Sequence, residues 1–123
     1  MRSLTRATDL DALIDASHDR PQFLFKHSTA CMVSAQASAV VSRAAESIAE
    51  ADFWRLLVIQ DRDLSHHIAE QSGIPHQSPQ VLLFDRGRVV WNGSHFAIRE
   101  AALRGALAKT GSGDVAAAPR RQA

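Results

Sequence analysis

The chain contains a single cysteine, Cys31, among its 123 residues. One cysteine cannot form an internal disulfide, so the sequence excludes a disulfide-stapled scaffold and fits a reducing compartment. Long apolar runs are also missing, since none approaches the roughly 18–20 residues that a membrane-spanning helix needs. The N-terminal segment is interrupted by Asp9, Asp11 and Asp15, unlike the apolar core of a secretory signal. We therefore expect a cytoplasmic protein that does not associate with membranes.

Neither sign of charge dominates the sequence. Lys and Arg total 14 and Asp and Glu total 13, and no basic stripe with interleaved aromatic residues is present, so a nucleic-acid partner is not expected. His66 and His67 are adjacent on a predicted helix and point in different directions. No cysteine or carboxylate cluster near them has the spacing of metal ligands, so we predict no metal site.

Hydrophobic residues make up 46% of the chain, enough to build the core of one compact domain. We predict this domain over residues 1–110. From about residue 111 onward the apolar periodicity is lost and the sequence is rich in Ala, Gly and Arg. Residues 111–123 are therefore predicted to form a disordered tail.

The apolar spacing alternates between a helical period and short continuous runs that are typical of strands covered on both faces. The predicted helices are residues 9–17, 32–50, 64–72 and 96–109, and the predicted strands are residues 23–25, 54–59, 81–84 and 89–91, with a weaker strand signal around Leu4. The first strands alternate with helices, which predicts parallel pairing, and the last two form a hairpin that turns at Gly87. The fold class is α/β, with a mixed central sheet of four to five strands and helices on both faces.

Several residues are predicted to begin or end these helices. Thr8 and Asp11 resemble a capping box, with the shorter Asp in place of Glu or Gln. Asp63 is the expected N-cap of the third helix, and Gly73 its C-terminal stop.

Cys31 lies at the junction between a predicted strand and the helix that begins near Met32. Unpaired N–H groups and the positive end of the helix dipole favour an anion at such a place, so thiolates form there more readily. Ser34 follows three residues later, where its hydroxyl can donate to the sulfur, and Lys26 and His27 can add positive potential. The alternatives are a solvated lysine, a serine bonded to its own backbone, and a cysteine that acts as a small buried hydrophobe.

Pro79 stands just before a predicted buried strand. Proline cannot donate to a sheet, so it belongs at a strand's first residue or edge. A cis Ser78–Pro79 bond would present the backbone of Ser78 as an unpaired edge for an extended peptide or thiol ligand. A trans proline that merely begins the strand is the alternative.

These features resemble the thioredoxin fold, in which a cysteine at a strand–helix junction and a proline before a hairpin occur together. More narrowly, the chain is similar to the monothiol bacilliredoxins of the bacillithiol redox system. The similarity is carried by FKHSTAC with Ser34, by DRDLSHHIAEQSGIPHQSPQ and by VVWNGSHFAI, over about residues 23–98. Family members usually have Pro-Ile after the cysteine, where this chain has Met32 and Val33, so a proline that would pre-set the first helical turn is absent.

The resemblance implies a thiol–disulfide oxidoreductase that reduces mixed disulfides between bacillithiol and client proteins. Cys31 would be the attacking and bacillithiol-accepting thiol, and Pro79 the cis-proline that faces it. Thr29, Met32 and Ser78 complete the predicted substrate-binding residues. Ser34 stands where a two-cysteine thioredoxin has its resolving cysteine, so an external thiol would resolve the adduct.

Bacillithiol is thus expected as a co-substrate, with no tightly bound cofactor. The released disulfide would pass to a flavin-dependent bacillithiol disulfide reductase.

Three other functions are weighed against this one. A monothiol glutaredoxin-like iron–sulfur carrier typically has Cys-Gly-Phe-Ser, and Met32 and Val33 lack that glycine. A non-enzymatic thioredoxin-fold module would dock partners at the Pro79 edge and keep Cys31 inert, with an alkylation rate no faster than that of a free thiol. A peroxidase is disfavoured because Leu24 stands where its motif needs a proline. Ser94 and His95 are predicted to cap the last helix or to flank the binding groove.

Overall fold

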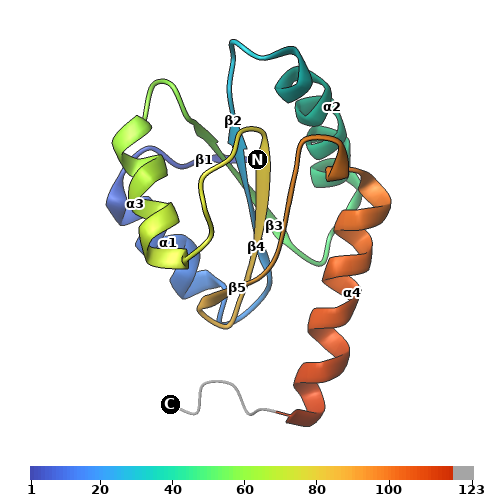
Figure 1. The fold of residues 1–123 in the computed structure, drawn as a ribbon. Helices are drawn as coiled ribbons and strands as arrows, with labels where there is room; N and C mark the ends of the chain where they lie inside the picture. Colours follow the sequence, from blue (N-terminus) through green and yellow to red (C-terminus); the bar gives the residue numbers. More distant parts are fainter. Residues whose placement is uncertain (118–123) are drawn as a thin grey trace.

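The computed structural model describes residues 1–117, and the side chains of residues 1–110 (Figure 1). The strands are β1 (Arg2–Ser3), β2 (Gln22–His27), β3 (Asp52–Leu57), β4 (Gln80–Asp85) and β5 (Arg88–Ser94). The helices are α1 (Ala7–Ala16), α2 (Met32–Ser47), α3 (Arg62–Ser72) and α4 (Glu100–Ala117), with a short 3₁₀ helix η1 (His95–Ala97). Every predicted strand and helix is present, with ends that differ by a few residues except in the last helix.

The strands form one mixed sheet in the order β1-β3-β2-β4-β5. β1 and β2 pair in parallel with β3, and β4 pairs antiparallel with both β2 and β5. Lys26 of β2 lies opposite Gln80 of β4, so the end of β2 meets the beginning of β4. The predicted mixed α/β sheet is confirmed, and its centre is the strand that leads to Cys31.

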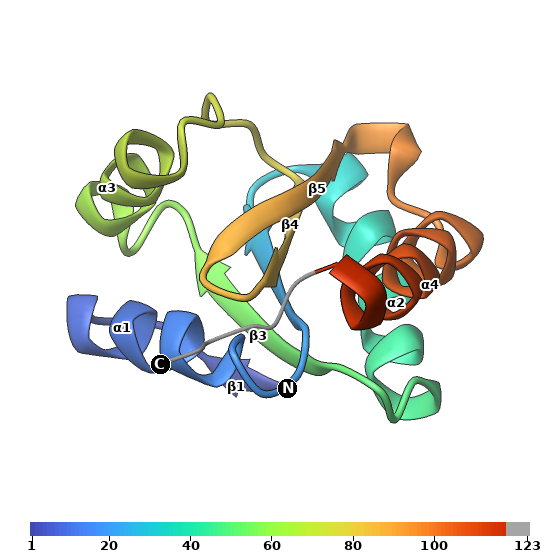
Figure 2. The same ribbon diagram turned by 90° about the horizontal axis from the view of Figure 1, so that it is seen from below.

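Helices cover both faces of the sheet, α1 and α3 on one side and α2 and α4 on the other (Figure 2). Alternate residues of β2 therefore enter two different cores. Phe23 and Phe25 pack with residues of α2 and α4, including Ala37, Val41 and Leu103. Leu24 packs with residues of α1 and α3, including Leu10, Leu13 and Ile68. This double coverage explains the continuous apolar run of β2.

Two predicted helix caps are wrong, because each helix begins earlier than expected. α1 starts at Ala7, so Asp9 rather than Asp11 is the residue whose side chain caps the start of the helix. A carboxylate oxygen of Asp9 accepts the N–H groups of Thr5 and Arg6 at 2.9 and 3.0 Å. In α3 the N-cap is Asp61 instead of Asp63.

Two glycines adopt the left-handed backbone conformation that other residues rarely tolerate. Gly73 ends α3 with φ of 76°, as predicted. Gly87 turns the β4–β5 hairpin with φ of 88°, and a Cβ there would lie 3.0 Å from the His18 ring. The same turn is fastened to the end of α1, because the Gly87 N–H donates to Ser17 Oγ at 2.8 Å.

The last helix runs further than predicted. α4 continues to Ala117, so residues 111–117, which we assigned to a disordered tail, belong to it. A helix needs no apolar face to keep its backbone hydrogen bonds, and the alanines near its end favour helix. Pro119, two residues beyond Ala117, is typical of the region after a helix end. The remainder of the predicted tail, residues 118–123, lies outside the described residues.

Candidate active site

Cys31 is the N-cap of α2, with the extended backbone (φ −120°, ψ 127°) that N-cap residues adopt. Its carbonyl oxygen accepts the Ala35 N–H at 3.0 Å, the first bond of the helix, and its own N–H donates to the Ser28 carbonyl at 3.3 Å. The side chain is partly exposed and has no capping hydrogen bond. The predicted position at the strand–helix junction is therefore confirmed, and the sulfur stands at the positive end of the helix dipole.

Ser34 fixes the loop that leads to Cys31. Its side chain is fully buried. The hydroxyl oxygen accepts the Ser28 N–H at 2.9 Å and lies 2.7 Å from Nδ1 of His27. We expected a hydrogen bond to the Cys31 sulfur, but the partners of Ser34 among the described residues are these two loop groups. Ser34 acts here by holding the segment between β2 and Cys31.

His27 does not carry the positive charge that we expected beside Cys31. Burial and the neighbouring Arg55 charge both lower the pKa of His27 below its ordinary value of 6.5. The imidazole is therefore neutral near pH 7. It stacks on Phe25, with ring centroids 5.2 Å apart, on the α2 side of the sheet.

Lys26 lies on the other side of the sheet, towards α3. Its side chain is fully buried, and Nζ donates to the Ser65 carbonyl at 3.3 Å. Burial lowers the pKa of Lys26 to about 8. Because successive β2 side chains alternate, His27 contacts α2 whereas Lys26 contacts α3. The alternative of a solvated lysine is wrong, because Lys26 is buried. No hydrogen bond joins Lys26 to Cys31 in the described part of the chain, and the positive potential that Lys26 adds at the thiol stays a prediction.

Replacing Lys26 by methionine is expected to raise the free energy of unfolding near pH 7 by on the order of 1–2 kcal/mol, since solvent relaxation screens part of the cost of a buried ammonium. The folded chain holds the pKa of Lys26 at about 8, against an ordinary value of 10.5. The cost is present below the folded pKa and fades as pH rises from about 8 towards about 10.5, where the unfolded chain binds more protons.

Urea denaturation of both proteins at about pH 7 and about pH 9.5 checks this expectation. The advantage of Lys26→Met should shrink at the higher pH. An advantage that stayed constant would mean that the charge of Lys26 has no part in it.

The segment before β4 contains the predicted cis peptide bond, between Ser78 and Pro79. Pro79 is buried, and its carbonyl accepts the His95 N–H at 3.1 Å. The Ser78 hydroxyl is buried without a hydrogen-bond partner among the described residues. The β2–β4 register brings this segment to the same end of the sheet as the loop that precedes Cys31 (Figure 1).

Exposed apolar side chains lie on the α2 side of the sheet. Met32 is 83% exposed at the start of α2, and Phe96 is 75% exposed in η1, which contacts α2. Thr29 is exposed in the loop before Cys31. Ser94 and His95, which were predicted to cap the last helix or flank the groove, precede η1 and begin it: Ser94 is its N-cap and His95, with φ of 53°, its first residue. α4 starts later, at Glu100, so the predicted capping of the last helix is wrong. We did not predict Phe96 as part of the site, because the apolar pattern assigned it to the start of the last helix.

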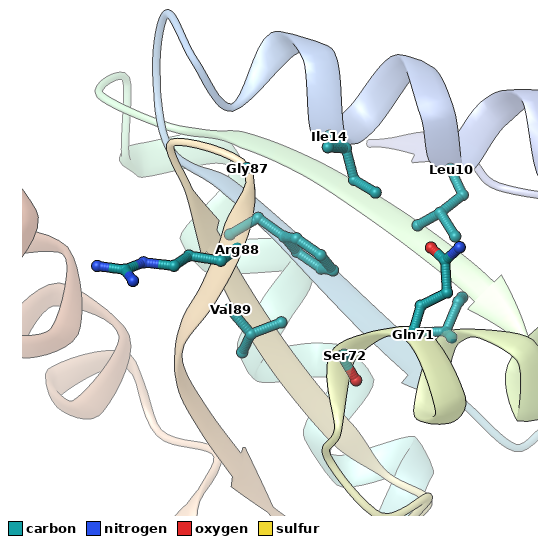
Figure 3. Close-up of a pocket in the computed structure, with 9 residues that line it drawn as sticks. Leu10, Ile14, Gln71, Ser72, Gly87, Arg88 and Val89 are labelled. Carbon is teal, nitrogen blue, oxygen red and sulfur yellow. The ribbon is translucent and has the colours of Figure 1, made fainter. Parts of the chain in front are cut away.

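A separate pocket of about 340 Å³ lies between α1, the end of α3 and the start of β5 (Figure 3). Its lining is mixed, since polar residues such as Gln71, Ser72 and Arg88 stand beside apolar ones. None of the predicted site residues lines it. The site at Cys31 is therefore a partly exposed surface at the end of the sheet and not this pocket.

Two kinds of feature are absent from residues 1–117. No helix there is long and apolar enough to cross a membrane. No group of three or more His, Cys, Asp or Glu side chains in that part of the chain is placed to hold a metal ion.

The strand order, the cysteine that begins α2 and the cis proline before β4 together define a protein of the thioredoxin fold. The chain belongs to the monothiol bacilliredoxin family, since residues 2–103 match the family described as Monothiol bacilliredoxin BrxC. This confirms the resemblance seen in the sequence and links the chain to the bacillithiol system.

Solved structures agree with this assignment. A structure described as that of a candidate oxidoreductase with a thioredoxin fold is 31% identical, has a TM-score of 0.78, and the match covers 85% of this chain and 91% of that one. Fasciola hepatica thioredoxin is 23% identical with a TM-score of 0.73, covering 89% and 99%. A thioredoxin variant from Halobacterium salinarum is 21% identical with a TM-score of 0.69, covering 89% and 88%. The two thioredoxins show the fold alone.

Proposed function

We propose that this protein removes bacillithiol from mixed disulfides on client proteins, acting through Cys31. The observation that carries the proposal is the partly exposed thiol at the N-cap of α2, with a serine at the position where a resolving cysteine would stand. The sulfur stands beside the unpaired N–H groups of the first turn and the positive end of the helix dipole, the surroundings in which an anion is favoured in general. Thiolate is the form that attacks disulfides.

In the first step, the Cys31 thiolate attacks the bacillithiol sulfur of the client's mixed disulfide. The new bond joins Cys31 to bacillithiol, the old disulfide breaks, and the client cysteine leaves as a thiolate. The exposed side chains of Met32 and Phe96 offer an apolar surface for the client. Thr29, Ser78 and Pro79, at the same end of the sheet as Cys31, are proposed to contact the substrate.

In the second step, a bacillithiol thiolate from solution attacks the adduct. Bacillithiol disulfide is released and Cys31 returns to the thiolate, ready for another cycle. Ser34 cannot perform this step because a hydroxyl does not exchange with a disulfide. The bacillithiol disulfide would be recycled by a flavin-dependent reductase, and the reducing cytoplasm is the compartment where a lone cysteine stays available for this chemistry.

A single-turnover assay tests the proposal. The reduced protein is mixed with a client whose one cysteine carries bacillithiol, and the freed client thiol is followed in time. Release should be much faster than with free cysteine at the same thiol concentration, because the site supplies both a thiolate and a docking surface. Release at the rate of free cysteine would reject the proposal and favour an inert docking module.

A further inference from the structure

The inference concerns the buried cation on the α3 side of the sheet. Lys26 is fully buried, and its hydrogen-bond partner in the described part of the chain is one backbone carbonyl, that of Ser65. No carboxylate of the described residues forms an ion pair with it. A buried ammonium without an anion is costly, so such groups are usually paired. An anionic ligand bound nearby would supply the missing counter-charge.

Two histidines lie close to this lysine and are open to solvent. The Ser65 hydroxyl, itself buried, lies 3.0 Å from Nδ1 of His76. The His76 ring in turn contacts the His66 ring, with centroids 5.6 Å apart. Burial, the Lys26 charge and His66 all lower the pKa of His76. Three groups that can take up a proton are thus gathered together, and a bound anion would favour their charged forms.

The loop that carries His76 is held in place by Gln80. The Gln80 amide nitrogen donates to the Pro75 carbonyl at 3.2 Å, and its amide oxygen accepts the Gln77 N–H at 3.3 Å. Gln80 is also the register partner of Lys26 across β2 and β4. The histidines, the lysine and the Pro79 segment are therefore fixed relative to one another, at the end of the sheet where β2 leads to Cys31.

We propose that His66 and His76, above Lys26, bind the carboxylate end of a low-molecular-weight thiol while its sulfur reacts at Cys31. For bacillithiol, that end is the malyl group, a dicarboxylate. The inference rests on the proposed function and adds to it a recognition site for the small thiol. A client's acidic side chain is the less favoured occupant, since the exposed apolar side chains Met32 and Phe96 lie on the α2 side, away from α3.

The rate of reaction with two disulfides tests the inference. Reduced wild-type protein is mixed with bacillithiol disulfide, or with the disulfide of cysteinyl-glucosamine, which lacks the malyl group, and Cys31 modification is followed by intact mass. The rate constant with bacillithiol disulfide is divided by the rate constant with the disulfide of cysteinyl-glucosamine. This ratio is then divided by the same ratio measured for free cysteine, which removes differences in leaving-group chemistry. The result is the corrected ratio. We expect a corrected ratio of about ten, the effect of one charge-assisted contact.

Two variants and one matched control complete the test. Lys26→Met and His76→Gln should each bring the corrected ratio close to one. Because His76→Gln changes an exposed side chain, its result does not depend on whether Lys26→Met folds normally. His67→Gln, at an exposed histidine of the same helix, should keep the wild-type ratio. A wild-type ratio near one, or a ratio that survives both Lys26→Met and His76→Gln, overturns the inference.

The outcome is separable from that of the proposed function. If the carboxylate site is absent but the function is right, bacillithiolated clients are still freed rapidly while the corrected ratio is near one. If the function is wrong but the site exists, the ratio remains high while clients stay modified.

Discussion

Replacing Cys31 by serine should abolish release of client thiols, with a fall in rate of at least about a thousand-fold, down to the background of the assay. A serine hydroxyl keeps its proton near neutral pH and does not attack disulfide sulfur, so the first step has no nucleophile. The structure predicts little effect on the fold, because the Cys31 side chain is partly exposed and makes no capping hydrogen bond.

The matched control for this variant is Ala39→Ser, which places the same new side chain at an exposed position of the same helix. It should release client thiols at the wild-type rate. Similar thermal unfolding of all three proteins would show that the loss is chemical. Persistent release by Cys31→Ser would mean that another group performs the reaction.

Replacing Ser34 by cysteine should change how the adduct is resolved. Positions three apart in the first helical turn have Cβ atoms about 5–6 Å apart, close enough for a disulfide after a small adjustment at the N-cap. The introduced thiol should displace bacillithiol from Cys31 and shorten the lifetime of the adduct by about a hundred-fold or more, since the attack becomes intramolecular. The protein should then accumulate as an internal disulfide.

The same substitution removes the hydroxyl that accepts the Ser28 N–H and lies beside His27 Nδ1. Leaving a buried donor without a partner costs about 1–3 kcal/mol. Ser34→Ala is the control, because it loses the same contacts without gaining a thiol. Equal adduct lifetimes in Ser34→Cys and Ser34→Ala, measured by intact mass, would show that this position cannot take part in exchange.

The sequence was sufficient for the α/β fold and for the place of Cys31 within it. The continuous apolar run of β2 indicated a strand covered on both faces, and the change of period near Met32 located the helix that Cys31 caps. Because both faces of β2 are buried, the sequence did not show on which side of the sheet the Lys26 side chain lies. A strand with no polar face does not reveal by alternation which side chain contacts which helix.

Other parts of the site depend on contacts between segments that are distant in the sequence. Ser34 bonds to a backbone group six residues away, and Ser65 meets His76 across eleven residues. The neutral state of His27 follows from burial and from Arg55 on the next strand. Local spacing shows none of these, so the predicted roles of Ser34 and His27 beside the thiol had to be revised.

The two sides of the sheet offer different surfaces to a substrate that reacts at Cys31. On the α2 side, Met32, which follows Cys31 directly, and Phe96 in η1 expose apolar surface. On the α3 side, His66 and His76 lie near the buried Lys26. A mixed disulfide joins a protein to a small charged thiol. We propose that the protein contacts the α2 side and that the small thiol contacts the α3 side.

The most direct test of the central claim is the intact mass of the protein after one turnover with a bacillithiolated client. The account predicts that the client loses one bacillithiol as this protein gains one, that peptide mapping places it on Cys31, and that added bacillithiol then removes it as bacillithiol disulfide. A client that is freed while the mass of this protein never changes would contradict the account.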